Sequence, residues 1–457
     1  MEQKFKDIII VGGGYSGTML AVNLLKNITK QEIKITIINE GNSFSRGLAY
    51  QTWDDNFLLN VPAGNMSALD SMPNNFVEYC KQIDPAFNEG SFVSRRIYGD
   101  YLEKTLEVAE REAGSGINRI FGQVVTLQKN LNENGFNLHL ADGQILQAGK
   151  VVLALGHFLP NSLSILETFK TDANYLSNPW DFSKLDKLPK NLPVLIIGTG
   201  LTAIDTLFRL TSVFQREVIL ISRKGLHPQG HRVTPKLPLF NNFPSYLNQS
   251  NLTVRNCFRA LRNEVSRRNL KGGDWRDVIN ELRAYTPEIW ARFSNKEKKR
   301  FLDHVVRFWD IHRHRIAPIA FQRFEKLLNS NQVKINVGRI IKCSKIKNGF
   351  EIDLRQGEEI KKFFVGGIVN CIGPNSDLST ISSPLISQLL KDGLISQDVT
   401  KVGLMVTDEY EVIGSDGVNI PNLYYVGPML KAKFWEAIAV PELRQHARKV
   451  AERLLLV

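Results

Sequence analysis

Three glycines near the start of the chain have the spacing of a phosphate-binding turn. Gly12, Gly14 and Gly17 fill the G-x-G-x-x-G pattern directly after the apolar run IIIV. In this pattern the first glycine permits a tight turn, the second lets the backbone approach a pyrophosphate, and the third lets the next helix pack against its strand. The free N–H groups at the start of that helix attract a diphosphate. We therefore predict that a dinucleotide contacts this turn, including Tyr15 and Ser16.

A second copy of the turn follows the apolar run VLII at residues 194–197. Gly198 and Gly200 hold the first two glycine positions, and Ala203, which is still small enough for close packing, holds the third. We expect Leu201 and Thr202 to line a second pyrophosphate beside the two glycines.

The two turns differ in the charge of the residues that end the next strand after each of them. Glu40 ends the first, and an acid about 20 residues past the glycines suits a ribose with two free hydroxyls. Arg223 and Lys224 end the second, where a cation would bind a 2′-phosphate. Two ordinary surface cations are the alternative. The economical assignment is FAD at the first turn and NADP(H), favoured over NAD(H), at the second.

The elements that must position these turns indicate an α/β fold with two Rossmann-like dinucleotide-binding domains and a helical insert. We expect residues 1–175 to form the first part of an FAD-binding domain, 190–365 an NADP-binding domain that includes the helical insert 252–328, and 366–457 the C-terminal part of the FAD domain. The expected strands are 33–39, 122–127, 136–140, 144–147, 151–155, 194–197, 217–221, 333–341, 350–354, 367–370 and 422–427, and the expected helices are 18–25, 75–82, 98–112, 204–210 and 436–455. Residues 42–74 read as a long loop, which is usually functional.

Composition favours anionic small molecules as partners. The 457 residues carry a net charge of +12, and much of the excess lies between Arg255 and Arg323. Nucleic-acid binding would need aromatic side chains among these charges for base stacking, but Trp275, Trp290 and Trp309 have spacings typical of helix cores. No apolar run reaches the ~18 residues of a spanning helix. We expect a cytoplasmic protein with no membrane contact.

Cysteines and histidines give no sign of a metal site. The four cysteines are Cys80, Cys257, Cys343 and Cys371. They form no C-x-x-C pair, so we expect buried, reduced thiols instead of a zinc site or a dithiol centre. His312 and His314 lie two apart with arginines beside them, so an anion-binding or packing role fits them better than a metal.

Beyond these residues, the chain resembles the FAD/NAD(P)-binding flavoprotein family that includes bacterial FAD-dependent urate hydroxylase and the aspartate N-monooxygenase that makes nitrosuccinate. The stretches that carry the resemblance are RGLAYQTWDDNFLLNVPAGNMSAL (46–69), RRIYGDYL (95–102), LALGH (153–157), SRKGLHPQGHR (222–232), WDIHRHRIAP (309–318), NCIGP (370–374) and VGPMLKAKFWEAIAVPELR (426–444). The chain departs from the family at Lys431-Ala432-Lys433, where an Arg-Gly pair is common.

The resemblance implies further cofactor contacts. Val124 matches the position whose backbone meets the adenine, and Asn60, Met66 and the Gly427-Pro428 pair match positions near the isoalloxazine, although core packing is an equal reading of Met66. Gly156 ends a strand at the same site. The candidate substrate contacts are His231, Arg315, Trp435 and Glu436. No catalytic acid or base is singled out, because the cofactor carries the chemistry.

The function that the resemblance implies is that of an FAD-dependent, NAD(P)H-using oxidoreductase. We expect a monooxygenase that uses O2, through a flavin C4a-hydroperoxide, to hydroxylate a small anionic or amino-acid-like substrate. Two alternatives stay open at this point. One is an NADPH-dependent flavin reductase or oxidase without oxygen insertion, and the other is a non-catalytic flavin-bound protein that binds a partner through the basic insert.

Overall fold

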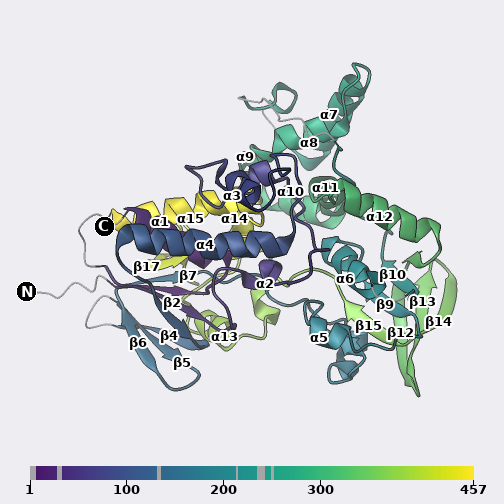
Figure 1. Ribbon diagram of the computed structural model, residues 1–457, viewed down its shortest axis with the longest axis horizontal. Coiled ribbons are helices and arrows are strands. Elements are labelled where there is room, and N and C mark those ends of the chain that lie inside the picture. Colours follow the sequence, from purple (N-terminus) through teal and green to yellow (C-terminus); the bar gives the residue numbers. More distant parts are fainter. Residues whose placement is uncertain are drawn as a thin grey trace, which may run out of the picture.

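The computed structural model describes residues 7–27, 33–130, 135–212, 215–233, 242–248 and 252–456. Two mainly parallel sheets lie side by side in this part of the chain, and a group of helices covers the region above them (Figure 1). The predicted α/β class is confirmed.

The first sheet has the strand order β16-β17-β7-β1-β2-β3. Its centre is β1 (Ile8–Val11), which pairs in parallel with β2 (Ile35–Asn39) and β7 (Lys150–Leu153). Because both faces are covered, the strands read as continuous apolar runs. Helices α1 (Tyr15–Asn27), α4 (Arg95–Ala113) and α15 (Val440–Leu455) pack together on one face (Figure 1). The remaining strands are β3 (Asn118–Phe121), β16 (Glu411–Ile413) and β17 (Asn419–Tyr425).

The second sheet has the order β11-β10-β9-β15-β8 and repeats the plan of the first. Its centre, β9 (Val194–Ile197), leads into α6 (Leu201–Ser212) and pairs in parallel with β10 (Val218–Ser222) and β15 (Gly367–Asn370). The edge strands are β8 (Tyr175–Leu176) and β11 (Val333–Val337).

Two small antiparallel sheets and two short helices complete the domains. The first sheet joins β4 (Val124–Asn130), β5 (Gly135–Leu140) and β6 (Ile145–Ala148), and the second joins β12 (Arg339–Ile346), β13 (Gly349–Gln356) and β14 (Glu359–Val365). Helix α13 (Pro384–Lys391) packs on β4. Helix α3 (Asn75–Ile83) packs on α4.

The predicted helical insert is present between the second-sheet strands β10 and β11. It consists of α7 (Val254–Asn269), α8 (Trp275–Arg283), α9 (Thr286–Arg292), α10 (Asn295–Arg300), α11 (Val306–Arg313) and α12 (Pro318–Asn329). The bulk of it lies over the C-terminal segment and away from the sheet it interrupts (Figure 1). Helix α11 contacts α8, and α9 contacts α14 (Lys431–Phe434).

Several boundaries differ from the sequence prediction. Helix α4 begins at Arg95 and not at residue 98, because Ser94 accepts a hydrogen bond from the Ile97 N–H and caps it. The last helix begins at Val440 and not at residue 436, because Trp435 takes a positive φ of 59° that breaks the helix. Strands β3 and β14 were not predicted, since their exposed residues lack an apolar alternation.

Two strands belong to a different sheet from the one that the predicted domain boundaries imply. Strands β8 and β15 both pair within the second sheet, although the prediction placed residues 175 and 367–370 in the flanking FAD segments. The division into domains otherwise stays a prediction. In the part of the chain described, no helix is long and apolar enough to cross a bilayer, and the cytoplasmic location also stays a prediction.

Candidate functional site: two glycine turns

The first glycine turn has no room for a side chain at two of its three glycines. Gly12 has a φ of +116°, and a Cβ there would lie 2.4 Å from the carbonyl oxygen of Ala154. A Cβ on Gly17 would lie 2.0 Å from the carbonyl oxygen of Gly12. At Gly14 the nearest atom is the Cα of Gly47, at 3.4 Å. The turn therefore exposes backbone in the manner that a pyrophosphate needs.

Asn39 supports this turn and was missed in the sequence. Its Oδ1 accepts a 3.0 Å hydrogen bond from the Gly13 N–H, and its Nδ2 donates 2.7 Å to the Ser43 carbonyl. Asn39 is the last residue of β2. Its position next to Glu40 is the sequence feature from which its role could have been predicted. Such a contact fixes the turn while leaving the neighbouring N–H groups for a ligand.

The predicted adenosine contacts lie together at the end of β2. The Glu40 carboxylate accepts a 3.0 Å bond from Gln123 Nε2, and the Gly122 N–H donates 3.0 Å to the Asn39 carbonyl. Val124 follows directly in β4, with its side chain buried. The structure thus places Glu40 and the backbone of Val124 at one edge, as a ribose and adenine would require.

The second turn repeats the geometry of the first. Gly198 has a φ of +115°, and a Cβ there would lie 2.4 Å from the carbonyl oxygen of Cys371. No atom lies within 4 Å of a Cβ position on Gly200, so its backbone faces open space next to Leu201 and Thr202. Each turn therefore lies against the exit of a neighbouring strand, Ala154 after β7 and Cys371 after β15.

Arg223 and Lys224 follow β10 at the edge where this second turn lies. The Gly198 N–H donates 2.8 Å to the carbonyl of Ile221, two residues before Arg223. Both cations are exposed, and within the described ranges no carboxylate pairs with either. Their position fits a 2′-phosphate, and the assignment stays a prediction.

The two halves meet at His231 and Asn60. His231 Nε2 donates 2.9 Å to the Asn60 carbonyl. Burial, followed by the positive charge of Arg315, lowers the pKa of His231 to about 3, so the ring is neutral at pH 7. A narrow cavity next to this contact is lined by Asn60 from the first half, Leu201 from the second, and Ile316 from the insert. Residues of the predicted FAD segment, the predicted NADP segment and the insert therefore meet at this point.

The other predicted flavin contacts lie at the ends of β7 and β17 or in the core. Gly156 has no atom within 4 Å of a Cβ position, whereas a Cβ on Gly427 would lie 2.7 Å from the Leu155 carbonyl oxygen. Tyr425 donates from its hydroxyl to that same carbonyl and accepts from the Met429 N–H, both at 3.0 Å, and so fixes the turn at Pro428. Met66 is buried in the main core cluster.

Three of the substrate candidates are enclosed by protein. Trp435 packs against Trp290, with ring centres 4.5 Å apart, and Glu436 pairs with Arg313. Arg315 is 6% exposed and donates to the Asn280 side-chain oxygen, while its buried Nε has no hydrogen-bond partner among the described residues. Burial and then the neighbouring Arg313 lower the pKa of Arg315 to about 10. Their role as substrate contacts, like that of His231, stays a prediction.

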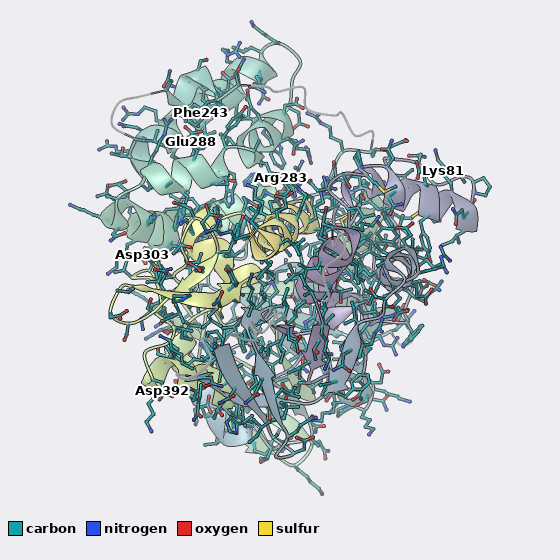
Figure 2. The ribbon with its side chains drawn as sticks, turned by 90° about the vertical axis from the view of Figure 1, so that its left-hand side faces the viewer. Lys81, Phe243, Arg283, Glu288, Asp303 and Asp392 are labelled. Carbon is teal, nitrogen blue, oxygen red and sulfur yellow. The ribbon has the colours of Figure 1, made fainter. Side chains whose placement is uncertain are left out.

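The helical insert is fixed to the C-terminal segment. Arg283 binds Glu442 through two bonds of 2.5 and 2.9 Å, and Trp290 Nε1 donates 2.9 Å to the Ala432 carbonyl. Figure 2 labels Arg283 where the insert meets the yellow C-terminal helices. The insert therefore forms a rigid cover above the loop that follows Pro428.

Comparison with known proteins identifies this arrangement as a known fold. Residues 9–158 match a family model described as FAD-NAD(P)-binding. An uncharacterized protein of Mycobacterium tuberculosis is 22% identical over 410 residues, which are 80% of this chain and 73% of that protein.

Solved structures match over nearly the whole chain. The reduced form of an ornithine hydroxylase from Pseudomonas aeruginosa has a TM-score of 0.68 at 15% identity, with 98% of each chain covered. An ornithine N-hydroxylase of Kutzneria sp. 744, solved with reduced FAD, NADP+ and L-ornithine, has a TM-score of 0.68 at 14% identity, with 98% of this chain and 99% of that chain covered. These similarities confirm the predicted two-domain flavoprotein fold.

Proposed function

We propose that this protein is an FAD-dependent, NADPH-using monooxygenase that hydroxylates a small anionic or amino-acid-like molecule. The observation that carries the proposal is the pair of equivalent glycine turns, one in each main sheet, with the His231–Asn60 hydrogen bond joining the two halves. Dinucleotides bind at the carboxyl ends of parallel strands, where both turns lie. The hydroxylases with the same fold add support, as does the narrower resemblance to urate hydroxylase and aspartate N-monooxygenase.

The residues of this chain fit the two cofactors in separate roles. Gly12, Gly14 and the start of α1 would hold the FAD pyrophosphate, and Gly200 with the start of α6 would hold that of NADPH. When bound, FAD supplies the oxygen chemistry and NADPH the hydride. The protein would orient the two cofactors, and the insert would limit the access of water.

A disulfide reductase that uses its own dithiol is disfavoured. All four cysteines are free, and Cys80, Cys257 and Cys371 are buried. Burial raises the pKa of all four thiols, so none is a reactive thiolate at pH 7. A flavin reductase or oxidase without oxygen insertion remains the competing enzyme activity.

The non-catalytic alternative relies on free positive charge in the insert, much of which is already paired. Arg267 and Arg268 both bind Glu264, and Arg300 binds Glu297. Pairing of this kind reduces the potential available to nucleic acid or an acidic partner.

The test begins with the absorbance spectrum of the purified protein, in which bound FAD should give a yellow colour. Rapid mixing with NADPH or NADH should show faster flavin reduction by NADPH. Candidate substrates should then accelerate NADPH oxidation while peroxide release falls. A protein that takes up no FAD would refute the proposal, and substrate-independent peroxide release would favour an oxidase.

A further inference from the structure

An ion pair joins the helix behind the second glycine turn to the segment that leads to Asn60, a predicted flavin contact. Arg95 begins α4, which packs on α1 over the first sheet, and Asp205 lies in α6, one turn after Leu201. Arg95 Nη2 donates 2.7 Å to Asp205 Oδ2, and the two side chains are only 8% and 13% exposed. A largely buried pair of charges therefore links the two proposed cofactor sites.

Arg95 also binds the segment that leads to Asn60. Residues 57–59 pair with residues 93–95 through two backbone hydrogen bonds of 2.8 Å. The Arg95 Nε adds a 3.2 Å bond to the Leu58 carbonyl. One guanidinium thus donates to the loop before Asn60 and to helix α6 at the same time.

The face of α6 that carries Asp205 forms one wall of the narrow cavity described above. Leu201, Asp205 and Phe208 line it from α6, and Leu58 and Asn60 line it from the loop. Helix positions that are three or four residues apart lie on the same side, so α6 presents one continuous face to the loop. Because Arg95 holds the loop wall and Asp205 belongs to the helix wall, the ion pair fixes the separation of the two walls.

A second ion pair joins the same helix to the same loop nearer the surface. Arg209, one turn after Asp205, donates 2.8 Å to Asp54 Oδ2 and also binds Asp186 through two bonds. Its side chain is 28% exposed, and a more exposed pair contributes less. The Arg95–Asp205 pair is therefore the more buried of these two ionic contacts between α6 and the FAD segment.

Two connections link the sheets along the chain, and they are hydrogen-bonded to each other. One runs from β7 to β8 and the other from β15 to β16. In the second connection, Asn375 Nδ2 donates 2.7 Å to Asn161 Oδ1 in the first. A pair of adjacent connections acts as a hinge, so a contact elsewhere is needed to fix the angle between the two sheets.

We propose that Arg95 is a positioning residue for flavin reduction, which holds α6, through Asp205, at the distance from the Asn60 loop that hydride transfer requires. This inference rests on the proposed function, in which the start of α6 binds NADPH. In this step a hydride leaves NADPH and reduces the flavin by two electrons, and the balance is FAD + NADPH + H+ giving FADH2 + NADP+. A misplacement of about 1 Å between reacting groups costs up to roughly a hundredfold in rate.

Arg95→Met removes the contact without leaving a fixed unpaired charge. Burial raises the pKa of Asp205, and the positive charge of Arg95 opposes this effect. Without the arginine the pKa rises further, so the buried carboxyl is more easily neutralised by a proton. The variant should therefore fold and bind FAD. Arg95→Lys keeps a cation next to Asp205 and serves as the conservative variant.

The kinetic test separates the geometry of hydride transfer from the binding of the cofactors. Stopped-flow reduction of the FAD-loaded full chain at varied NADPH concentration gives the limiting rate of flavin reduction and the Kd for NADPH. Arg95→Met should lower the limiting rate by roughly tenfold or more, with Kd and FAD content unchanged, because the two glycine turns are intact. Arg95→Lys should recover most of the rate. Dithionite, which needs no nucleotide site, should reduce the flavin of all variants equally fast.

Two further variants assign the effect to the pair. Asp205→Asn in the Arg95→Met background should cause little further loss, because Arg95 acts through Asp205 and the two effects are then not additive. Arg119→Met is the matched control. Arg119 also binds a carboxylate through two bonds, of 2.9 and 2.8 Å to Glu110, but both residues lie in the FAD segment. The limiting rate of this control should equal that of wild type.

A distance measurement tests the same point without turnover. Spin labels at Lys104→Cys in α4 and Glu325→Cys in α12 report the separation of the two halves, because both positions are exposed and α12 contacts β11. Cys343→Ser removes the native cysteine that is not buried. Pulsed electron paramagnetic resonance should give one narrow distance distribution with Arg95 present and a broader or shifted one in Arg95→Met.

The outcomes separate this inference from the function on which it rests. Unchanged limiting rates in Arg95→Met and in the double variant, at full FAD content, would overturn the inference and leave the proposed function intact. Loss of FAD, or equal slowing of reduction by dithionite and by NADPH, would assign Arg95 a role in folding alone and would also overturn it. Failure of NADPH to reduce the wild-type flavin would remove the proposed function itself, and the inference with it.

Discussion

Arg313 and Glu436 form a buried, two-bond ion pair that joins the helical insert to the segment after α14. Arg313 Nη2 lies 2.9 Å from Glu436 Oε2, Arg313 Nε lies 3.2 Å from Oε1, and the side chains are 6% and 3% exposed. Glu442 lies 3.7 Å from the same guanidinium. The pair holds the insert against the segment between α14 and α15.

Removing one partner of this pair should destabilise the protein strongly. Glu436→Gln leaves the Arg313 charge buried, for which the usual cost is about 3–5 kcal/mol, and Glu442 should keep the loss near the lower value. Thermal unfolding followed by circular dichroism should show a lower midpoint. Glu107→Gln, in an exposed pair with Lys104, should change stability by at most about 1 kcal/mol. Equal midpoints for the two variants would contradict the structural role of the buried pair.

Gly12→Ala should abolish FAD binding. Gly12 has a φ of +116°, and its Cβ would lie 2.4 Å from the Ala154 carbonyl oxygen, so the turn must open and its backbone N–H groups move away from the pyrophosphate. The ratio of flavin absorbance to protein absorbance measures the effect. Gly116→Ala is the matched control, because its Cβ meets only the end of the Glu110 side chain at 3.8 Å. Full flavin content in Gly12→Ala would exclude this turn as the FAD site.

Arg223→Ala and Lys224→Ala should weaken NADPH binding and spare NADH. Each exposed cation lost from a 2′-phosphate should raise the KM for NADPH by roughly tenfold. Initial rates of flavin reduction at varied concentrations of the two nucleotides give the ratio. Arg267→Ala, which removes another exposed arginine, should leave the ratio unchanged. If the two variants raise the KM for NADPH and the KM for NADH equally, Arg223 and Lys224 do not contact the 2′-phosphate.

Stability should fall on mild acidification because of His231. The pKa of its ring lies at about 3 in the folded protein and near 6.5 in an unfolded chain. The unfolded state therefore binds more protons between these values, and the free energy of unfolding decreases as the pH falls from about 6.5 toward 3. His231→Gln keeps a neutral donor for the Asn60 carbonyl without this titration. Its unfolding midpoint should depend less on pH over this window, and a slope equal to that of wild type would contradict the prediction.

The sequence was informative where local geometry leaves one solution. A glycine turn between an apolar strand and a helix can be read directly, because Gly12 and Gly198 need a positive φ and a close carbonyl oxygen that no side chain permits. The carbonyl oxygens that approach Gly12 and Gly198 belong to Ala154 and Cys371, the residues that directly follow β7 and β15.

Contacts between segments that are distant in the chain could not be predicted from the sequence. Asn39 looks like an ordinary polar residue at the end of a strand, and only the fold places it where it accepts a hydrogen bond from the Gly13 N–H. Glu436 was predicted as a substrate contact, and its pairing with Arg313 depends on how the insert packs.

The sequence alone therefore determined that two dinucleotide turns exist, which strand ends carry an acid or cations, and that an insert separates the strands of the second sheet. The tertiary structure decided which segments contact each other: the insert packs on the C-terminal segment, His231 donates to the Asn60 carbonyl, and Arg313 pairs with Glu436. The reason is physical. Turn conformation is fixed by sterics within a few residues, whereas burial and pairing of charge depend on segments more than a hundred residues apart.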